Sequence, residues 1–91
     1  MADIQHRPGR FELHVDGAVC ELDYQMDDSR DGSRVVFTHT GVPASLQGRG
    51  LAAKLVEAGL AWALQEGHKV TPACSYVARY IERHPAWSDL L

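Results

Sequence analysis

Two glycines, Gly48 and Gly50, stand directly before a stretch whose apolar residues recur at helical spacing. A helix N-terminus leaves backbone N–H groups unpaired and carries a partial positive charge, so it attracts an anion when the preceding turn is bare enough to admit one. Glycines have no side chain to block an approaching anion, and Arg49 adds a positive charge that can reach a phosphate. Residues 47–52 therefore suit a pyrophosphate, although a Gly-x-Gly turn before a helix is often only a tight bend.

The two cysteines have different surroundings in the sequence. Cys20 falls between Ala18 and Leu22 on the apolar side of an alternating pattern, which indicates a buried small hydrophobic residue. Cys74 falls at the start of a second predicted helix, in its first turn or as its cap, where unpaired N–H groups lower the pKa of a thiol. Cys74 is thus either a reactive nucleophile or a packed thiol without chemistry. A redox role is disfavoured because a C-x-x-C partner is missing.

His39 is the histidine best placed for acid–base chemistry, because it ends the third predicted strand and its side chain titrates near neutral pH. A lone histidine at a strand end is also compatible with a structural role. The other histidines of the folded region, His14, His68 and His84, show no partner spacing. With only two widely separated cysteines, the sequence predicts no metal site.

Hydrophobic periodicity predicts the elements that position these side chains. Apolar residues alternate along residues 10–16 and 18–26, which indicates two antiparallel strands joined by a two-residue Asp-Gly turn. A polar turn is expected over residues 27–32. The β-branched and aromatic residues of 33–40 then predict a third strand.

The second half of the chain predicts a helix, a strand and another helix. Apolar residues at helical spacing indicate a helix over residues 51–66, which Gly67 closes. A short strand follows at 68–71, and the helical period resumes over 74–84. The tail, residues 86–91, is expected to dock on the domain. A strand, crossover helix and strand in one sheet should place the two strands side by side and parallel.

The element order β-β-β-α-β-α predicts an α/β (α+β) fold, with a small, mostly antiparallel sheet of about four strands and two helices. The chain of 91 residues has room for one domain. We expect residues 1–9 to be a flexible leader and residues 10–91 to form that single domain.

Charge and composition narrow the function classes. The net charge of −3 argues against a nucleic-acid partner. No apolar run is long enough to span a bilayer, and the N-terminus lacks the apolar region of a signal peptide, so we expect a cytoplasmic protein without a membrane partner. A domain this short buries a modest share of its surface, so it is expected to be a monomer or a weak homodimer.

The stretch Gln47-x-x-Gly50-x-Ala52 resembles the Gln/Arg-x-x-Gly-x-Gly/Ala signature of the GNAT superfamily of N-acetyltransferases, which holds the pyrophosphate of acetyl-coenzyme A. More closely, the chain resembles a minimal GNAT-like subfamily, roughly a hundred residues long, with a Pro-x-Cys-Ser-Tyr motif. The residues that carry this resemblance, in chain order, are His39-Thr40-Gly41-Val42-Pro43, Gln47-Gly48-Arg49-Gly50, Pro72-x-Cys74-Ser75-Tyr76-Val77 and Tyr80-Ile81-x-x-His84-Pro85. It covers about residues 10 to 91.

The resemblance implies a GNAT-type fold and an acetyl-CoA-dependent N-acetyltransferase that moves acetyl to an unidentified amine, either a small molecule or a peptide. It implies that the third strand splays from its neighbour around residues 36–42, leaving a gap for pantetheine near Val42. The implied cofactor-binding residues are Val42, Gln47, Gly48, Arg49, Gly50, Leu51, Ala52 and Tyr80.

For catalysis the resemblance implies Cys74, as acyl acceptor or as a group that activates the acceptor, and His39 is the candidate base. Arg79 and Arg83, four residues apart, can contact phosphates of the cofactor or form an ordinary solvated face. The early helices that cover the acceptor site in full-length relatives are absent, which implies an open cleft. The alternative function is a non-catalytic coenzyme A or acyl-coenzyme A binding module.

Overall fold

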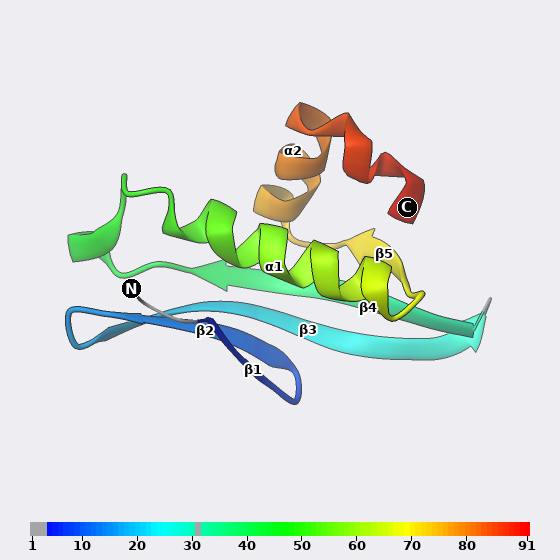
Figure 1. The fold of residues 1–91 in the computed structure, drawn as a ribbon, viewed down its shortest axis with the longest axis horizontal. Coiled ribbons are helices and arrows are strands. Elements are labelled where there is room, and N and C mark those ends of the chain that lie inside the picture. The colour runs from blue at the N-terminus through cyan, green and yellow to red at the C-terminus, as the bar shows by residue number, and fades with distance from the viewer. Residues whose placement is uncertain (1–3, 31) are drawn as a thin grey trace.

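The computed structural model describes residues 4–30 and 32–91. They form one five-stranded sheet, with strand order β1-β2-β3-β4-β5, and two α-helices that lie on the same face of it (Figure 1). The elements in chain order are β1 (Ile4–Arg7), β2 (Arg10–Val15), β3 (Ala18–Arg30), β4 (Gly32–Gly41), η1 (Ala44–Leu46), α1 (Leu51–Gln65), β5 (Lys69–Pro72), α2 (Ser75–Arg83) and η2 (Pro85–Leu90). This confirms the predicted fold class.

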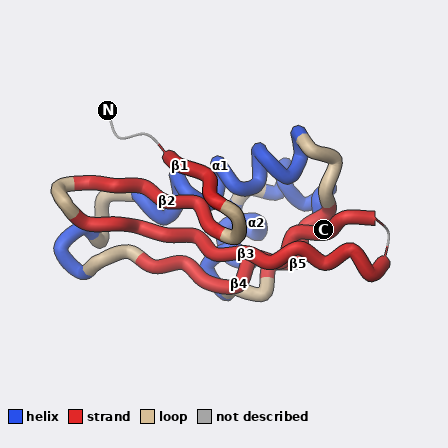
Figure 2. The backbone as a smooth tube through the Cα atoms, turned by 90° about the horizontal axis from the view of Figure 1, so that it is seen from below, coloured by secondary structure: helices blue, strands red, loops and turns tan. Residues whose placement is uncertain are grey.

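The core lies between the sheet and the helices. Alternation along the strands sends Phe11 and Leu13 of β2, and Leu22 of β3, to the helical side, where all three are buried. The intervening side chains point to the other face, which no helix covers and which Figure 2 presents to the viewer. The sheet is therefore apolar on one side and polar on the other, which the period-2 pattern predicts.

The N-terminal strand β1 is a correction to the expected leader. Ile4–Arg7 pairs antiparallel with β2, whereas we expected residues 1–9 to be flexible and the sheet to have about four strands. The His6 ring stacks on Phe11, with ring centroids 4.0 Å apart, and meets Trp62 edge-on. Because β1 has no alternating apolar pattern, the sequence did not predict its pairing with β2 or the packing of Ile4 and the His6 ring. Residues 1–3 lie outside the described residues.

The hairpin of β3 and β4 is longer than predicted. The polar residues 27–30 continue β3 instead of forming a turn, and Asp27 pairs with Arg34 across the ladder. Of the other two residues of the expected turn, Gly32 begins β4 and Asp31 is outside the described residues. The hairpin extends past the other strands at one end of the molecule (Figure 1).

Helix α1 packs against the middle of the sheet along its buried face, which carries Leu55, Val56 and Leu60. Gly59 lies on the same face. A Cβ added there would sit 2.9 Å from Leu22 Cδ2 and 3.0 Å from the Phe37 ring, so this glycine sets how closely the helix approaches the sheet. Gly67, with φ of 76°, follows the helix in the left-handed conformation expected of a closing glycine.

Strands β4 and β5 pair in parallel, as predicted, but only over Arg34–Phe37 and Lys69–Pro72. Beyond Phe37, residues 38–41 pair only with β3 among the described elements, so β4 has an open edge there. The register of β3 and β4 also shifts between Asp23 and Tyr24, which leaves Thr38 as an extra residue. This open edge lies within the region, residues 36–42, where the resemblance implied a gap beside the strand.

The chain ends in two short helical segments. Helix α2 packs on α1, with Val77 and Ile81 buried, and η2 follows it with Leu90 in the core, as the predicted docking tail requires. Among the described residues, no helix combines the length and the apolar character needed to cross a bilayer.

Candidate functional site

The turn before α1 depends on two glycines in the left-handed conformation. Gly48 has φ of 85° and Gly50 has φ of 75°, a region that side chains disfavour. A Cβ built at either residue meets no atom within 4 Å, so both face open space. Gly50 is the N-cap of α1 and supplies no side-chain cap, and the first turn holds no acidic residue. The first amides of α1 thus open toward a bare turn, which favours an anion.

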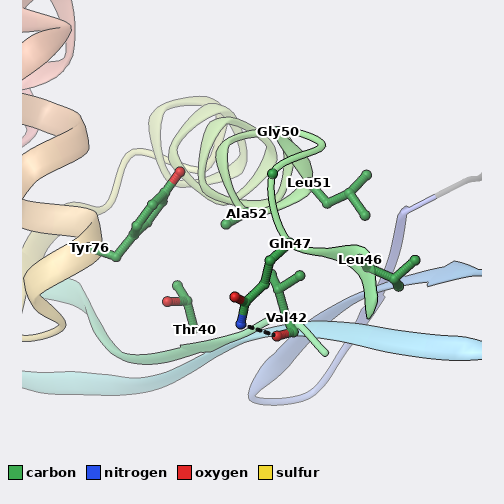
Figure 3. Close-up of a pocket in the computed structure, with 9 residues that line it drawn as sticks. Thr40, Val42, Leu46, Gln47, Gly50, Leu51, Ala52 and Tyr76 are labelled. Atoms are coloured by element: carbon green, nitrogen blue, oxygen red, sulfur yellow. Dashed lines mark hydrogen bonds between the residues drawn. The ribbon is translucent and has the colours of Figure 1, made fainter. Parts of the chain in front are cut away.

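A cavity of about 450 Å³ opens at this turn (Figure 3). Its floor is the open end of β4, its wall is the first turn of α1, and Tyr76 of α2 lies across from them. The lining residues are Thr40, Val42, Leu46, Gln47, Gly48, Gly50, Leu51, Ala52 and Tyr76. Of the eight predicted cofactor-binding residues, all but Arg49 and Tyr80 line this one cavity.

Gln47 and Arg49 turn in different directions. The Gln47 side-chain amide donates to the Val42 carbonyl at 3.2 Å, which ties the glycine turn to the end of β4. Arg49 instead pairs with Asp16 at the tip of the β2–β3 hairpin, with Nη1 and Oδ2 3.2 Å apart. Both partners are largely exposed, so this pair holds Arg49 weakly.

Cys74 lies where β4 and β5 separate. Its backbone N–H donates to the Phe37 carbonyl at 2.9 Å, directly at the last paired residue of β4, and its Sγ is 3.7 Å from the Thr40 hydroxyl. It is half-buried and is the N-cap of α2. Of the two predicted starts for this helix, the later one is therefore confirmed, because Pro72 ends β5 and does not begin the helix.

The surroundings of Cys74 favour its thiolate. Burial raises the pKa of the thiol, but hydrogen bonding from the Val77 amide, the Thr40 side chain and the Tyr76 amide outweighs burial, and the net pKa is lowered. The sulfur makes no capping hydrogen bond of standard geometry, so the amides act on it at longer range. Cys20, by contrast, is fully buried in the core, as predicted, and burial raises its pKa.

His39 does not lie beside Cys74. The extra residue Thr38 reverses the alternation of β4, so that Phe37 faces the helices while His39 pairs with Asp23 and lies exposed on the uncovered face. There its ring is grouped with Glu21 and Asp23, with donor atoms within 4.8 Å of one another.

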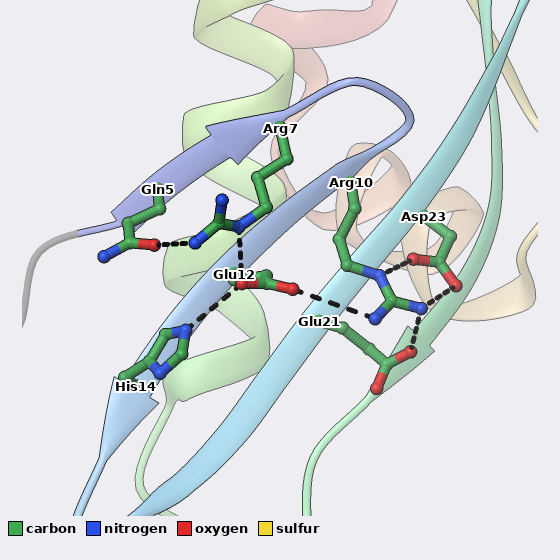
Figure 4. Close-up of polar contacts among 7 residues, drawn as sticks. All are labelled: Gln5, Arg7, Arg10, Glu12, His14, Glu21 and Asp23. Atoms are coloured by element: carbon green, nitrogen blue, oxygen red, sulfur yellow. Dashed lines mark hydrogen bonds and ion pairs between the residues drawn. The ribbon is translucent and has the colours of Figure 1, made fainter.

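The uncovered face at this point carries an ion-pair network (Figure 4). Arg10 contacts Glu21 at 2.9 Å and Asp23 at 2.7 Å, and Glu12 binds both Arg7 and His14. Arg10 contacts both carboxylates beside His39, so each of them already has a cationic partner among the described residues.

Tyr80 and Tyr76, two tyrosines of α2, lie in different surroundings. Tyr80 is buried: its hydroxyl donates to Glu57 Oε2 at 3.4 Å and its ring stacks on His84. Burial, followed by the Glu57 carboxylate, raises the pKa of Tyr80. Tyr76, one turn earlier and 38% exposed, lines the cavity in its place.

A family model described as GCN5-related N-acetyl-transferase matches residues 10–90. The chain belongs to this family.

Individual relatives agree with this assignment. The chain is 36% identical over 55 residues to Protein NATD1 of Gallus gallus and of Homo sapiens, which covers 59% of this chain and about half of each relative. The chain thus spans about half the length of the curated relatives it matches. The solution NMR structure of a GCN5-like protein from Staphylococcus aureus superposes with a TM-score of 0.74 at 26% identity, covering 97% of this chain and 85% of that one.

In this member of the acetyltransferase family, three residues that line the cavity are not among the predicted cofactor-binding residues: Thr40, Leu46 and Tyr76. Tyr76 was the most accessible to prediction, since it belongs to the same helix as Tyr80 and precedes it by one turn. Thr40 was not accessible, because its orientation toward the helical side follows from the extra residue in β4.

Proposed function

We propose that the chain is an acetyl-CoA-dependent N-acetyltransferase that moves the acetyl group to an amine acceptor, a small molecule or a peptide. The observation that carries this proposal is the continuity of the site: the cavity at the glycine turn reaches Thr40 on the open edge of β4, and Thr40 contacts Cys74. The diphosphate would lie at residues 48–52, and the pantetheine arm along residues 38–42.

The residues present fit an extended ligand that has an anion near its middle. Bare amides and two glycines suit the diphosphate, and unpaired backbone on β4 suits amide groups of the arm. Cys74 follows in the stretch Pro72-x-Cys74-Ser75-Tyr76, which supports membership of the minimal GNAT-like subfamily. Both cysteines are free thiols, so the cytoplasm, which keeps thiols reduced, is the proposed compartment.

Cys74 is the proposed nucleophile. Its thiolate sulfur forms a bond to the acetyl carbon, the bond from that carbon to the coenzyme A sulfur breaks, and coenzyme A leaves as a thiolate that takes up a proton. The neutral amine then attacks the acetyl-cysteine, transfers a proton to solvent and releases the Cys74 thiolate. This route needs no histidine beside the cysteine, which agrees with the position of His39 on the opposite face.

A non-catalytic coenzyme A binding module is the second candidate. It is favoured by the position of His39, because among the cavity-lining residues only Tyr76 can exchange a proton. Direct transfer to an amine would leave the base unassigned. The two candidate functions therefore differ in the role of Cys74: it is the nucleophile in the enzyme, and it has no chemical role in the binding module.

Binding is tested first by thermal shift. Acetyl-CoA and coenzyme A should raise the melting temperature by an amount that grows with the logarithm of the ligand concentration relative to Kd. Gly50→Glu should abolish the shift, because it places a carboxylate where the diphosphate binds. Gly67→Glu is the matched control: it has the same left-handed strain and open surroundings at the other end of α1. Equal loss of the shift in both variants would reject the proposed anion site.

Chemistry is tested by acetyl incorporation. Intact-mass measurement after incubation with acetyl-CoA should show one acetyl group in the wild type and none in Cys74→Ser, with Cys20 remaining unlabelled because it is buried. Labelling of both proteins alike would reject the covalent route. Thiol release with a panel of polyamines and lysine peptides then separates the enzyme from the binding module.

A further inference from the structure

Two arginines of α2 have no acidic partner within the described part of the chain. Arg79 and Arg83 are exposed and lie four residues apart, so their side chains share one face of the helix. Arg7, Arg10 and Arg49 each contact a carboxylate instead.

The two arginines border a hollow that adjoins the cavity at the glycine turn. It has a volume of about 190 Å³, and its lining residues are Ala53, Tyr76, Arg79, Tyr80, Arg83 and His84. Tyr76 lines both hollows, and Ala53 directly follows Ala52, which lines the larger one. A molecule seated at the glycine turn can therefore extend past Tyr76 and meet Arg79.

The positive charge that lines this second hollow favours an anionic group of the ligand. Its lining carries two guanidinium groups and no carboxylate. The Glu57 carboxylate accepts a hydrogen bond from the Tyr80 hydroxyl. Among the described residues, Glu82 forms no ion pair with Arg79 or Arg83. Guanidinium groups bind phosphate through paired N–H donors, so a phosphate monoester is the group that fits.

We propose that Arg79 and Arg83 bind the 3′-phosphate of coenzyme A, as a second anion site beside the diphosphate site at residues 48–52. This inference rests on the proposed function, because it assigns a further part of the same ligand. Coenzyme A carries its 3′-phosphate and its diphosphate on one ribose, so two neighbouring anion sites match the molecule. The arginines thereby distinguish coenzyme A from a ligand that has the diphosphate alone.

Arg83 also has a structural role, since a cation in the last turn of a helix is favoured by the helix dipole. A loss of stability in an arginine variant would therefore not identify a phosphate site. The informative readout is the ratio of affinities for coenzyme A and dephospho-coenzyme A, which lacks only the 3′-phosphate. A change in folding stability alters both affinities alike and leaves this ratio unchanged.

The experiment is isothermal titration calorimetry with both ligands at fixed salt. The wild type should bind coenzyme A about tenfold more tightly than dephospho-coenzyme A, as expected for hydrogen bonds to charged groups. In the Arg79→Gln/Arg83→Gln double variant the ratio should fall to about one, because coenzyme A binding weakens about tenfold while dephospho-coenzyme A binding is unchanged. Lys54→Gln, which removes an exposed cation of α1 outside both hollows, should keep the wild-type ratio.

Equal affinity of the wild type for the two ligands would overturn this inference, and so would a double variant that retains the wild-type ratio. Neither result would affect the proposed function, since both require binding. If the folded wild type binds neither ligand, the proposed function fails, and this inference fails with it.

Discussion

Cys20 and Cys74 show how position determines the chemistry of one side chain. Both are free thiols, but Cys20 is enclosed by the core, whereas Cys74 caps a helix at the point where two strands separate. Burial alone acts on the first and raises its pKa, while amides and a hydroxyl lower that of the second. The sequence predicted this difference from the strand and helix patterns around each residue.

We expect Cys74 to react with iodoacetamide several-fold faster at neutral pH than a model thiol, because more of it is thiolate. Thr40→Val removes one of the groups that lower its pKa, so the pH midpoint of alkylation should rise in that variant. Mass spectrometry of labelled peptides across a pH series measures both. Cys20 is the internal control and should react only after unfolding. A pH midpoint that is the same in Thr40→Val and in the wild type would show that the Thr40 hydroxyl does not lower the pKa of Cys74.

At the level of single residues, motif spacing predicted most of the residues that line the cavity, but it did not predict which face of the sheet each side chain of β4 occupies. Gln47 and Gly50 follow from the signature and Gly48 from the Gly-x-Gly pattern, because a turn before a helix is a local structure. The direction of His39 depends on one extra residue opposite Asp23, which no local pattern reveals. A one-residue shift sends every following side chain to the other face.

At the level of elements, the distance between α1 and the sheet is set by Gly59. Most helix interiors avoid glycine because of its conformational freedom, yet here the absence of a side chain lets Leu22 and Phe37 approach the helix.

Gly59→Ala should therefore destabilise the protein, although alanine is the better helix former. Overpacking costs about 1–3 kcal/mol, and the gain in helix propensity offsets about 1 kcal/mol of it, so we expect a net loss of up to about 2 kcal/mol. Urea unfolding measures the difference. Ala61→Gly on the exposed side of α1 is the control for propensity and should cost about 1 kcal/mol. A stabilised Gly59→Ala would mean that the neighbours shift without cost.

We expect the N-terminal strand to make the free energy of unfolding depend on pH. Burial lowers the pKa of His6, whose ring contacts Phe11 and Trp62 and whose Nε2 bonds the Tyr24 hydroxyl. The unfolded chain therefore binds a proton at higher pH than the folded one. The resulting stability is present above the ordinary histidine pKa, about 6.5, and is lost as pH falls from there through the folded value.

His6→Phe should remove this dependence, because phenylalanine keeps the ring contacts but does not titrate. The free energy of unfolding, measured by urea between about pH 8 and pH 5, should fall less steeply for the variant than for the wild type. His14→Phe is the comparison, since His14 is exposed on the polar face. Parallel curves for the wild type and His6→Phe would show that this ring does not couple to folding.

At the level of the whole molecule, one layer of helices packed on one sheet gives a radius of gyration that is usual for a chain of this length. The radius of gyration is 12.7 Å, close to the value of about 12 Å typical of this chain length. Among the residues that the structure describes, the exposed large apolar ones are Val19, Met26, Leu64, Tyr76 and Leu91. They come from several elements, and scattered apolar residues of this kind do not make an interface.

We therefore expect a monomer, although the length of the chain alone left a weak homodimer open. Sedimentation velocity at micromolar concentrations should show one species near 10.0 kDa, with and without coenzyme A. A dimer at these concentrations would mean that a surface formed by several elements associates. Repeating the run in high salt would then show whether the charged face of the sheet, with its Arg10 network, holds the two copies together.

The open edge of β4 has one more consequence. Residues 38–41 carry backbone groups without a strand partner on the β5 side, and such a rim is a template on which another extended chain can add itself. The hazard is limited because the rim is short and Pro43 follows it closely. A ligand that lies along this edge would occupy the backbone groups that a further strand would otherwise pair with. The ligand-free protein should therefore aggregate more readily than the ligand-bound protein at the same temperature.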